Sequence, residues 1–150
     1  MIELRVVDRA YGVVLSELHC ACFPYGWRPS AMDEVLRSPG VYAILAADGE
    51  RAAGLALGRR IADEAELLTL AVAPDYRRQG LGAALVRAVA SVVPLARLLH
   101  LEVGADNPPA LTLYRTLGFA QAGRRKDYYR RPDGRLVDAL TFAIEPKKLA

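Results

Sequence analysis

Apolar residues near the N-terminus follow two spacings, one typical of a strand and one typical of a helix. IELRVV at residues 2–7 alternates apolar and polar side chains, which predicts a half-buried strand. A helix is expected over residues 10–22, and Asp8 precedes it as a candidate N-cap. Its apolar positions include Val13, Leu15, Leu18 and Cys22.

FPYGWRP at residues 23–29 interrupts this helix with two prolines and a glycine. Ser30, with Asp33 three residues later, predicts the start of a second short helix that ends near Arg37. The N-terminal region is therefore a strand followed by two helices with a kinked loop between them.

Longer apolar runs fill the middle of the chain. Two of them occupy residues 41–61 and flank Asp48-Gly49, a two-residue turn signal that predicts a hairpin. Residues 65–73 predict a third strand, residues 80–93 a helix rich in Ala, Leu and Val, and residues 98–104 another buried strand. Prolines end the first two of these three segments.

The C-terminal part begins with Asn107, a candidate N-cap that is followed by a proline. The helix that starts there is expected to end at Gly118. Residues 120–130 and 136–144 predict a second hairpin. The resulting order βααβββαβαββ predicts a single α/β domain over residues 1–150, a mixed sheet with helices on both faces and a parallel crossover.

Charge is concentrated in one segment of this pattern. The first 123 residues hold 12 basic and 13 acidic side chains, whereas RRKDYYRRPDGR at residues 124–135 holds six basic and two acidic ones. Nucleic-acid binders usually carry a broader basic stripe, so no direct nucleic-acid partner is expected. The patch at residues 124–131 fits either an acidic partner or a solvated hairpin.

The cysteines and the hydropathy narrow the class of protein further. Cys20 and Cys22 lack a second Cys/His pair, so buried free thiols are expected instead of a metal site, and His19 is expected on the helix surface or in the core. No apolar run approaches the roughly 20 residues of a membrane span, and the first ten residues lack a signal-peptide core. A cytoplasmic protein with no membrane partner is the expectation.

VAPDYRRQGLGAAL at residues 72–85 places two arginines before a Gly-x-Gly and a helix. It lacks the Lys-Ser/Thr of a P-loop, and Leu85 stands where the dinucleotide fingerprint needs Gly or Ala. A strand–helix turn of this kind instead predicts a pyrophosphate site, with phosphates on free N–H groups at the helix start. The alternative is a glycine-softened helix start with solvated arginines.

This segment resembles the acyl-CoA-binding motif of the GNAT superfamily of N-acetyltransferases, since Arg77, Gly80 and Gly82 match its [R/Q]-x-x-G-x-[G/A] core. LEVGADNPPALTLYRTLGF at residues 101–119 is similar to the next motif of that family. The resemblance implies the GNAT fold and acetyl-CoA as co-substrate, without a metal. Together with an early Phe23-Pro24, GRRKDYY and DALTF, these motifs look like those of RimI-type enzymes, which acetylate the N-terminal alanine of a ribosomal protein.

The resemblance assigns the donor site to two segments and one further side chain. The loop and helix start would hold the phosphates through Arg77, Arg78, Gln79, Gly80, Leu81, Gly82 and Ala83. The preceding strand would pair with the pantetheine arm along Leu70, Ala71 and Val72. In the family the strands separate at a bulge where an N–H faces the thioester carbonyl, and Val72 is the matching position. Asn107 would contact the donor or serve only as an N-cap.

Two side chains are candidates for proton transfer. Glu102 is the one acid in an apolar strand, and the matching glutamate of RimI-like enzymes is their base, so it is expected to act directly or through water. The alternative is a solvent-facing edge position. Tyr114 is the candidate acid for the leaving thiolate, with core packing as its alternative. Direct attack in a ternary complex is expected, because neither cysteine lies in these motifs.

The acceptor groove is expected between the kinked loop and the second hairpin, which flank it in GNAT folds. The aromatic candidates for its lining are Phe23, Tyr25, Trp27, Tyr128 and Tyr129. FPYGWRPS and Gly104 depart from the RimI pattern, the latter standing where many relatives carry arginine. The expected acceptor is a protein N-terminal α-amine, with a ribosomal protein as candidate partner. A polyamine or aminoglycoside acetyltransferase and a non-catalytic acyl-CoA-binding module remain the alternatives.

Overall fold

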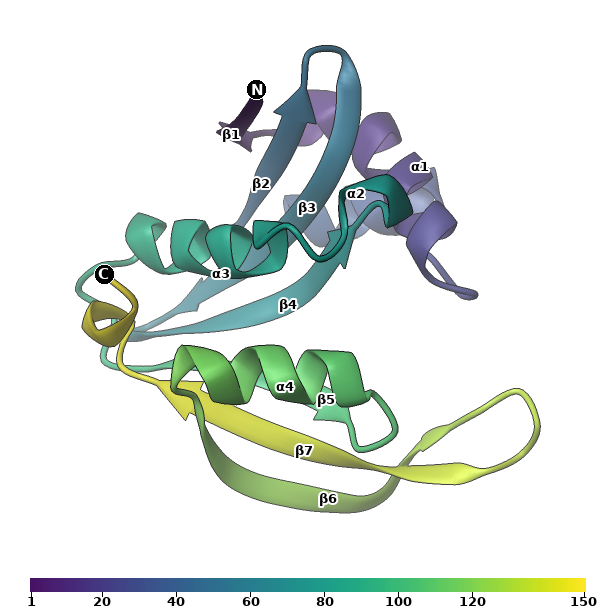
Figure 1. The fold of residues 1–150 in the computed structure, drawn as a ribbon, viewed down its shortest axis with the longest axis vertical. Helices are drawn as coiled ribbons and strands as arrows, with labels where there is room; N and C mark the ends of the chain where they lie inside the picture. Colours follow the sequence, from purple (N-terminus) through teal and green to yellow (C-terminus); the bar gives the residue numbers. More distant parts are fainter.

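A computed structural model describes all 150 residues, and strands from the whole length of the chain form one seven-stranded mixed sheet (Figure 1). Its elements are β1 Ile2–Val7, α1 Gly12–Cys22, α2 Pro29–Arg37, β2 Val41–Asp48, β3 Arg51–Ile61, β4 Glu64–Val72, α3 Leu81–Val92, β5 Leu99–Gly104, α4 Pro108–Leu117, β6 Ala120–Arg130 and β7 Leu136–Ile144. The order βααβββαβαββ is confirmed. None of the helices has the length and apolar character needed to cross a bilayer.

The sheet has the strand order β1-β2-β3-β4-β5-β7-β6, and only β4 and β5 are parallel. The crossover that joins these two strands contains α3, as a parallel connection requires. β4 and β5 pair at only two positions, Ala65 with Leu99 and Glu66 with His100. Beyond these pairs the two strands separate, so the sheet is split at its centre.

Helices cover both faces of the sheet, as the alternation of β2 illustrates. Ala43 and Leu45 face the core under α1 and α2, whereas Ile44 and Ala46 face the core under α3. In Figure 1, α3 and α4 lie on the near face, and α1 and α2 lie on the far face. Because successive side chains of a strand point to opposite faces, one buried strand contributes apolar side chains to the cores on both faces of the sheet.

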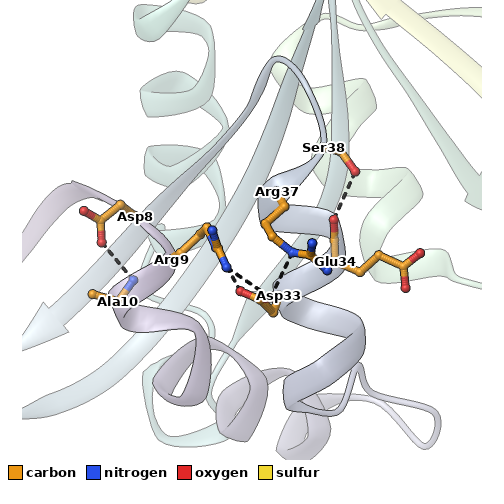
Figure 2. A network of polar contacts seen from close by, with 7 residues as sticks. All are labelled: Asp8, Arg9, Ala10, Asp33, Glu34, Arg37 and Ser38. Carbon is orange, nitrogen blue, oxygen red and sulfur yellow. Dashed lines mark hydrogen bonds and ion pairs between the residues drawn. The ribbon is translucent and has the colours of Figure 1, made fainter.

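The starts of the first two helices differ from the sequence prediction (Figure 2). Asp8 does act as a cap, but for the short 3-10 helix Arg9–Tyr11 that precedes α1, where it accepts the Ala10 N–H at 2.9 Å. Ser30 does not cap α2, which begins at Pro29 after Arg28. Proline at the first helical position already fixes the required φ, so a side-chain cap is not needed there.

Asp33 has a different role from the expected one at the start of α2. Its carboxylate accepts from Arg9 at 3.0 Å and from Arg37 at 3.0 Å, which ties the entry of α1 to α2 (Figure 2). The hairpin turn is also shifted by one residue, because Asp48 still pairs with Arg51 and the turn itself is Gly49-Glu50. Both differences are local and leave the order of elements unchanged.

Candidate active site

A cavity of about 1080 Å³ opens where β4 and β5 separate. Its walls come from the C-terminal halves of these two strands, from the loop before α3 and from α4. The residues expected at a donor or catalytic site that line it are Leu70, Val72, Arg77, Arg78, Gly80, Leu81, Gly82, Ala83, Glu102, Asn107 and Tyr114. Segments far apart in the sequence thus meet in one cleft.

The edge of β4 that faces the cleft carries unpaired backbone groups. The Ala73 N–H donates to the Ala53 carbonyl at 2.9 Å, and antiparallel alternation then directs the Ala71 groups toward β3 and those of Leu70 and Val72 toward β5. Ala71 does not line the cavity, and its side chain packs in the core under α1. An extended amide chain could therefore pair with β4 at Leu70 and at the Val72 N–H, whereas the Val72 carbonyl already accepts from the Arg77 side chain.

The bulge in β4 lies nearer the start of the strand than Val72. The register with β3 shifts between Thr69 and Leu67, so Leu68 is the extra residue. This corrects the expectation that the bulge coincides with Val72. The carbonyl of Val72 accepts from the Arg77 side chain at 2.9 Å and lies 3.6 Å from the Cys22 sulfur.

Six consecutive backbone N–H groups, those of residues 78–83, donate to no acceptor in the protein. α3 starts after Gly80 without a side-chain cap, and its first backbone bond is donated by Ala84. Gly80 has φ +79 and Arg78 has φ +62, two left-handed residues that curl the loop. A run of free donors at a helix N-terminus fits an anion such as a pyrophosphate.

The polar side chains of this loop differ in their availability. Arg77 uses its Nε–H on the Val72 carbonyl, which leaves both terminal nitrogens of the guanidinium free at the cavity. Arg78 also lines the cavity and makes no side-chain hydrogen bond. Gln79 donates to the Asp75 carbonyl at 3.2 Å and does not line the cavity, so only its backbone N–H is available.

Glu102 lies on β5 opposite Thr141 of β7, and its side chain faces the cleft. The side chain is 27% exposed, and its Oε2 atom is buried. Arg125 Nε stands 2.9 Å from that oxygen but does not align with it as a hydrogen-bond donor, so the contact is an ion pair. β5 is not an outer strand of the sheet, but Glu102 lies beyond its two pairs with β4, so β7 flanks it on one side and the cleft lies on the other.

Tyr114 combines the two roles considered for it. Its ring is 6% exposed and packs edge-on against Phe119 at 5.6 Å, within the core under α3 and α4. Tyr114 lines the same cavity as Glu102, and its hydroxyl makes no hydrogen bond to the protein. Burial raises the pKa of Tyr114 to about 12, so the phenol stays protonated at neutral pH and is available as a proton donor.

Asn107 is the N-cap of α4, as expected. Its side-chain oxygen accepts the Ala110 N–H at 3.2 Å. The side-chain NH₂ group is not used by this cap and belongs to a residue that lines the cavity. A contact between the Asn107 amide nitrogen and the bound acetyl donor is therefore compatible with capping.

Of the five aromatic residues expected at the acceptor groove, Phe23 and Tyr129 line the cavity. Tyr25 is 74% exposed and Tyr128 is exposed at the second hairpin, both outside the cavity lining. The indole of Trp27 stacks on the imidazole of His19 with centroids 4.5 Å apart, so it packs the kinked loop instead of lining the cleft.

His19 is a core residue that fixes the kinked loop to β4. The Trp27 N–H donates to its Nδ1 at 2.9 Å, which leaves the proton on Nε2 for Thr69 Oγ1 at 2.9 Å. Burial lowers the pKa of His19 to about 4. The neutral imidazole therefore holds the loop that carries Phe23 against a strand of the cleft.

Three residues at the site, Cys22, Arg125 and Arg131, were not anticipated in these roles, and Cys20 differs from its expected burial outside the site. Cys20 is exposed, against the expected burial, and Cys22 lines the cavity beside Val72. Arg125 contacts Glu102, and Arg131 lines the cavity while Asp106 holds its guanidinium at 2.6 and 2.8 Å. A side chain at Gly104 would meet the Arg131 nitrogen at 2.4 Å, so glycine leaves room for this arginine.

A sheet that splits between two parallel strands, with free N–H groups at the mouth of the split, defines the class of N-acetyltransferase folds. The chain belongs to the acetyltransferase (GNAT) family, whose family model matches residues 13–119. The GNAT fold expected from the two motifs is therefore confirmed.

Similar proteins agree with the resemblance to RimI-type enzymes. The chain is 43% identical over 94 residues to the [ribosomal protein bS18]-alanine N-acetyltransferase of Escherichia coli K12, a match that covers 61% of this chain and 63% of that enzyme. It is 38% identical over 110 residues to the N-alpha-acetyltransferase RimI of Mycobacterium tuberculosis, covering 69% and 68%. The crystal structure of the Escherichia coli ribosomal-protein-S18-alanine N-acetyltransferase superposes with a TM-score of 0.88 at 29% identity, covering 96% and 93%.

Proposed function

We propose that the chain is an acetyl-CoA-dependent N-acetyltransferase whose acceptor is the N-terminal α-amine of a protein. The observation that carries the proposal is the single cleft in which the six free N–H groups, the open edge of β4 and the Glu102–Tyr114 pair of side chains meet. The named activities of the similar proteins make an alanine terminus of a ribosomal protein the first acceptor to test. Such an acceptor would place the reaction in the cytoplasm.

The donor would bind along one wall of the cleft. Its pyrophosphate would accept from the N–H groups of residues 78–83 and from Arg77 or Arg78, because an anion at a helix start meets both free donors and a favourable dipole. The amides of its pantetheine arm would pair with Leu70 and with the Val72 N–H in the manner of an added strand. The thioester would then lie between β4 and β5, on the side where Glu102 and Tyr114 line the cavity.

Glu102 would act as the general base. An amine attacks only in its neutral form, so the incoming ammonium must first lose a proton to a carboxylate or to a water that the carboxylate holds. Glu102 is the acidic side chain among the residues that line the cavity. From β5 it lines the same cavity as the end of β4, where the acceptor amine would approach the thioester.

Tyr114 would act as the general acid. As the amine nitrogen bonds to the acyl carbon, the carbon–sulfur bond breaks and the thiolate takes the phenol proton. The second proton of the attacking nitrogen restores the phenol, so the products are one amide, one thiol and the proton held at Glu102. No acyl group passes through a side chain in this scheme.

Release of free thiol from acetyl-CoA tests the proposal, with alanine-terminal peptides, polyamines and aminoglycosides as separate acceptors. We expect turnover with the peptides, and a loss of at least a hundredfold in Glu102→Gln while acetyl-CoA still binds. Glu66→Gln is the matched control, because Glu66 lies on β4 outside the cavity lining. Turnover of small amines alone, or of no amine despite binding of acetyl-CoA, would contradict the proposed acceptor or the proposed catalysis respectively.

A further inference from the structure

Arg125 is the one arginine that contacts the candidate base. Its Nε lies 2.9 Å from Glu102 Oε2, a buried oxygen that receives no aligned hydrogen bond. The carboxylate therefore keeps its hydrogen-bonding capacity for a further donor even while a cation stands beside it. Arg125 itself is 58% exposed.

A bulge in β6 aims this arginine at Glu102. The register between β6 and β7 shifts between Arg125 and Tyr129, and Asp127 takes the left-handed φ +52. The Asp127 N–H donates to Asp138 Oδ1 at 2.9 Å, and the other Asp138 oxygen pairs with Arg124 at 2.5 Å. Asp138 thus holds the bulge through both of its carboxylate oxygens, and the conformation of the bulge sets the position of Arg125.

Aromatic rings complete the surroundings of the ion pair. The Arg125 guanidinium lies 5.3 Å from the centroid of Tyr128, whose ring packs edge-on against Tyr129. Burial raises the pKa of Tyr129, and the Glu102 carboxylate raises it further. Arg125, Glu102 and Tyr129 therefore share one electrostatic environment.

A fixed cation beside the base acts differently on different amines. It offsets the attraction of the Glu102 carboxylate for an acceptor in the ammonium form and has little effect on the neutral amine. With ordinary pKa values of 7.7–8.0 for an α-amine and 10.4 for a lysine side chain, about a quarter of an α-amine but only about one in a thousand lysine side chains is neutral at pH 7.4. The penalty therefore falls mainly on strongly basic acceptors.

We propose that Arg125 is a specificity-determining residue that favours weakly basic α-amines over lysine side chains and polyamines. This inference rests on the proposed N-acetyltransferase function. It assigns the basic hairpin a role at the reacting nitrogen, in addition to any attraction of acidic partners. Arg125 acts through its charge and position beside the carboxylate that deprotonates the acceptor.

The test compares kcat/KM for three acceptors: a lysine-free peptide with N-terminal alanine, an N-blocked peptide with one lysine, and spermidine. In Arg125→Gln we expect the preference for the α-amine over each of the other two to fall at least fivefold. Arg125→Lys should restore the preference, because it keeps the charge. Arg130→Gln is the matched control, since it removes one arginine from the same strand without a contact to Glu102.

A change below fivefold in Arg125→Gln, or an equal change in Arg130→Gln, would overturn this inference and leave the proposed function standing. Absence of α-amine turnover in the unmodified protein would overturn the proposed function itself. Arg125→Met serves as the second truncation if the glutamine variant is unstable, with circular dichroism and acetyl-CoA binding as folding controls. The same fivefold threshold applies to it.

Discussion

Replacing Tyr114 with phenylalanine separates catalysis from folding. The Tyr114 hydroxyl makes no hydrogen bond to the protein, so its removal leaves no buried partner unsatisfied, and phenylalanine keeps the edge-on contact with Phe119. We therefore expect the free energy of unfolding to change by less than about 1 kcal/mol. Loss of a general acid instead lowers turnover by about 10²–10⁴-fold, which corresponds to about 3–5 kcal/mol in the activation barrier.

The assay measures thiol release at saturating acetyl-CoA with an alanine-terminal peptide, alongside urea unfolding and calorimetric binding of acetyl-CoA. Tyr11→Phe is the control, because Tyr11 is an exposed tyrosine of the 3-10 helix before α1. Since the pKa of Tyr114 is about 12, its ionisation should not lower kcat anywhere below about pH 11. A kcat within threefold of the unmodified protein would refute the assignment, and a parallel loss of stability and turnover would indicate core packing alone.

Three further predictions concern the loop before α3, the pH dependence of stability and the space beside Gly104. Gly80→Ala should raise the dissociation constant for acetyl-CoA about tenfold. Alanine is strained by about 1–2 kcal/mol at φ +79, and a loop that relaxes from this strain in the free protein no longer holds its N–H groups in the arrangement that would bind the pyrophosphate. Gly49→Ala, at φ +62 and equally free of clashes, should lose similar stability in urea unfolding but bind acetyl-CoA normally. His19 has a folded pKa of about 4 against 6.5 unfolded, so the unfolded chain binds more protons below pH 6.5 and stability falls as pH falls. The free energy of unfolding, measured with urea, should be about 2–3 kcal/mol lower at pH 4.5 than at pH 7.5, and this difference should be missing from His19→Gln. An equal difference in both proteins would contradict the prediction. Gly104→Ala should raise the KM for the peptide acceptor as Arg131→Gln does, with no further rise in the double variant, because the new Cβ would lie 2.4 Å from the Arg131 nitrogen; additive effects would show that the two positions act independently.

The order of helices and strands could be predicted because its signals are local. Apolar spacing, the Asn107 cap, the glycine after α4 and the prolines after β4 and α3 all act within a few residues of where they stand. The start of α2 was mispredicted for a related reason. Ser30 and Asp33 have the spacing of a capping box, but Asp33 is used by Arg9, which is 24 residues away in the sequence.

The free N–H groups and the open strand edge that we assign to the acetyl donor were also predictable in outline, since they depend on one continuous segment. The motif at residues 77–82 and the strand before it specify free N–H groups and an open edge, whatever follows in the chain. The position of the bulge at Leu68 was not predictable, because it depends on the register that β4 adopts against β3. Leu68 itself is one leucine in a run of apolar residues with nothing to mark it.

The acceptor side depends on contacts between residues that are distant in the sequence, and this is where the prediction from sequence stopped. Glu102 could be singled out because one acid in an apolar strand needs a polar partner or water. Its partner Arg125 could not be singled out, because it is one of six basic residues in one segment. Only the bulge before Tyr129 directs it to Glu102. The same bulge also determines which charged side chain lies beside Glu102. Under the proposed function, an acceptor nitrogen that reaches Glu102 would come within the field of the Arg125 guanidinium, so the basic hairpin would constrain the charge of the acceptor at the reacting atom. The overall positive charge of the hairpin alone does not identify the partner.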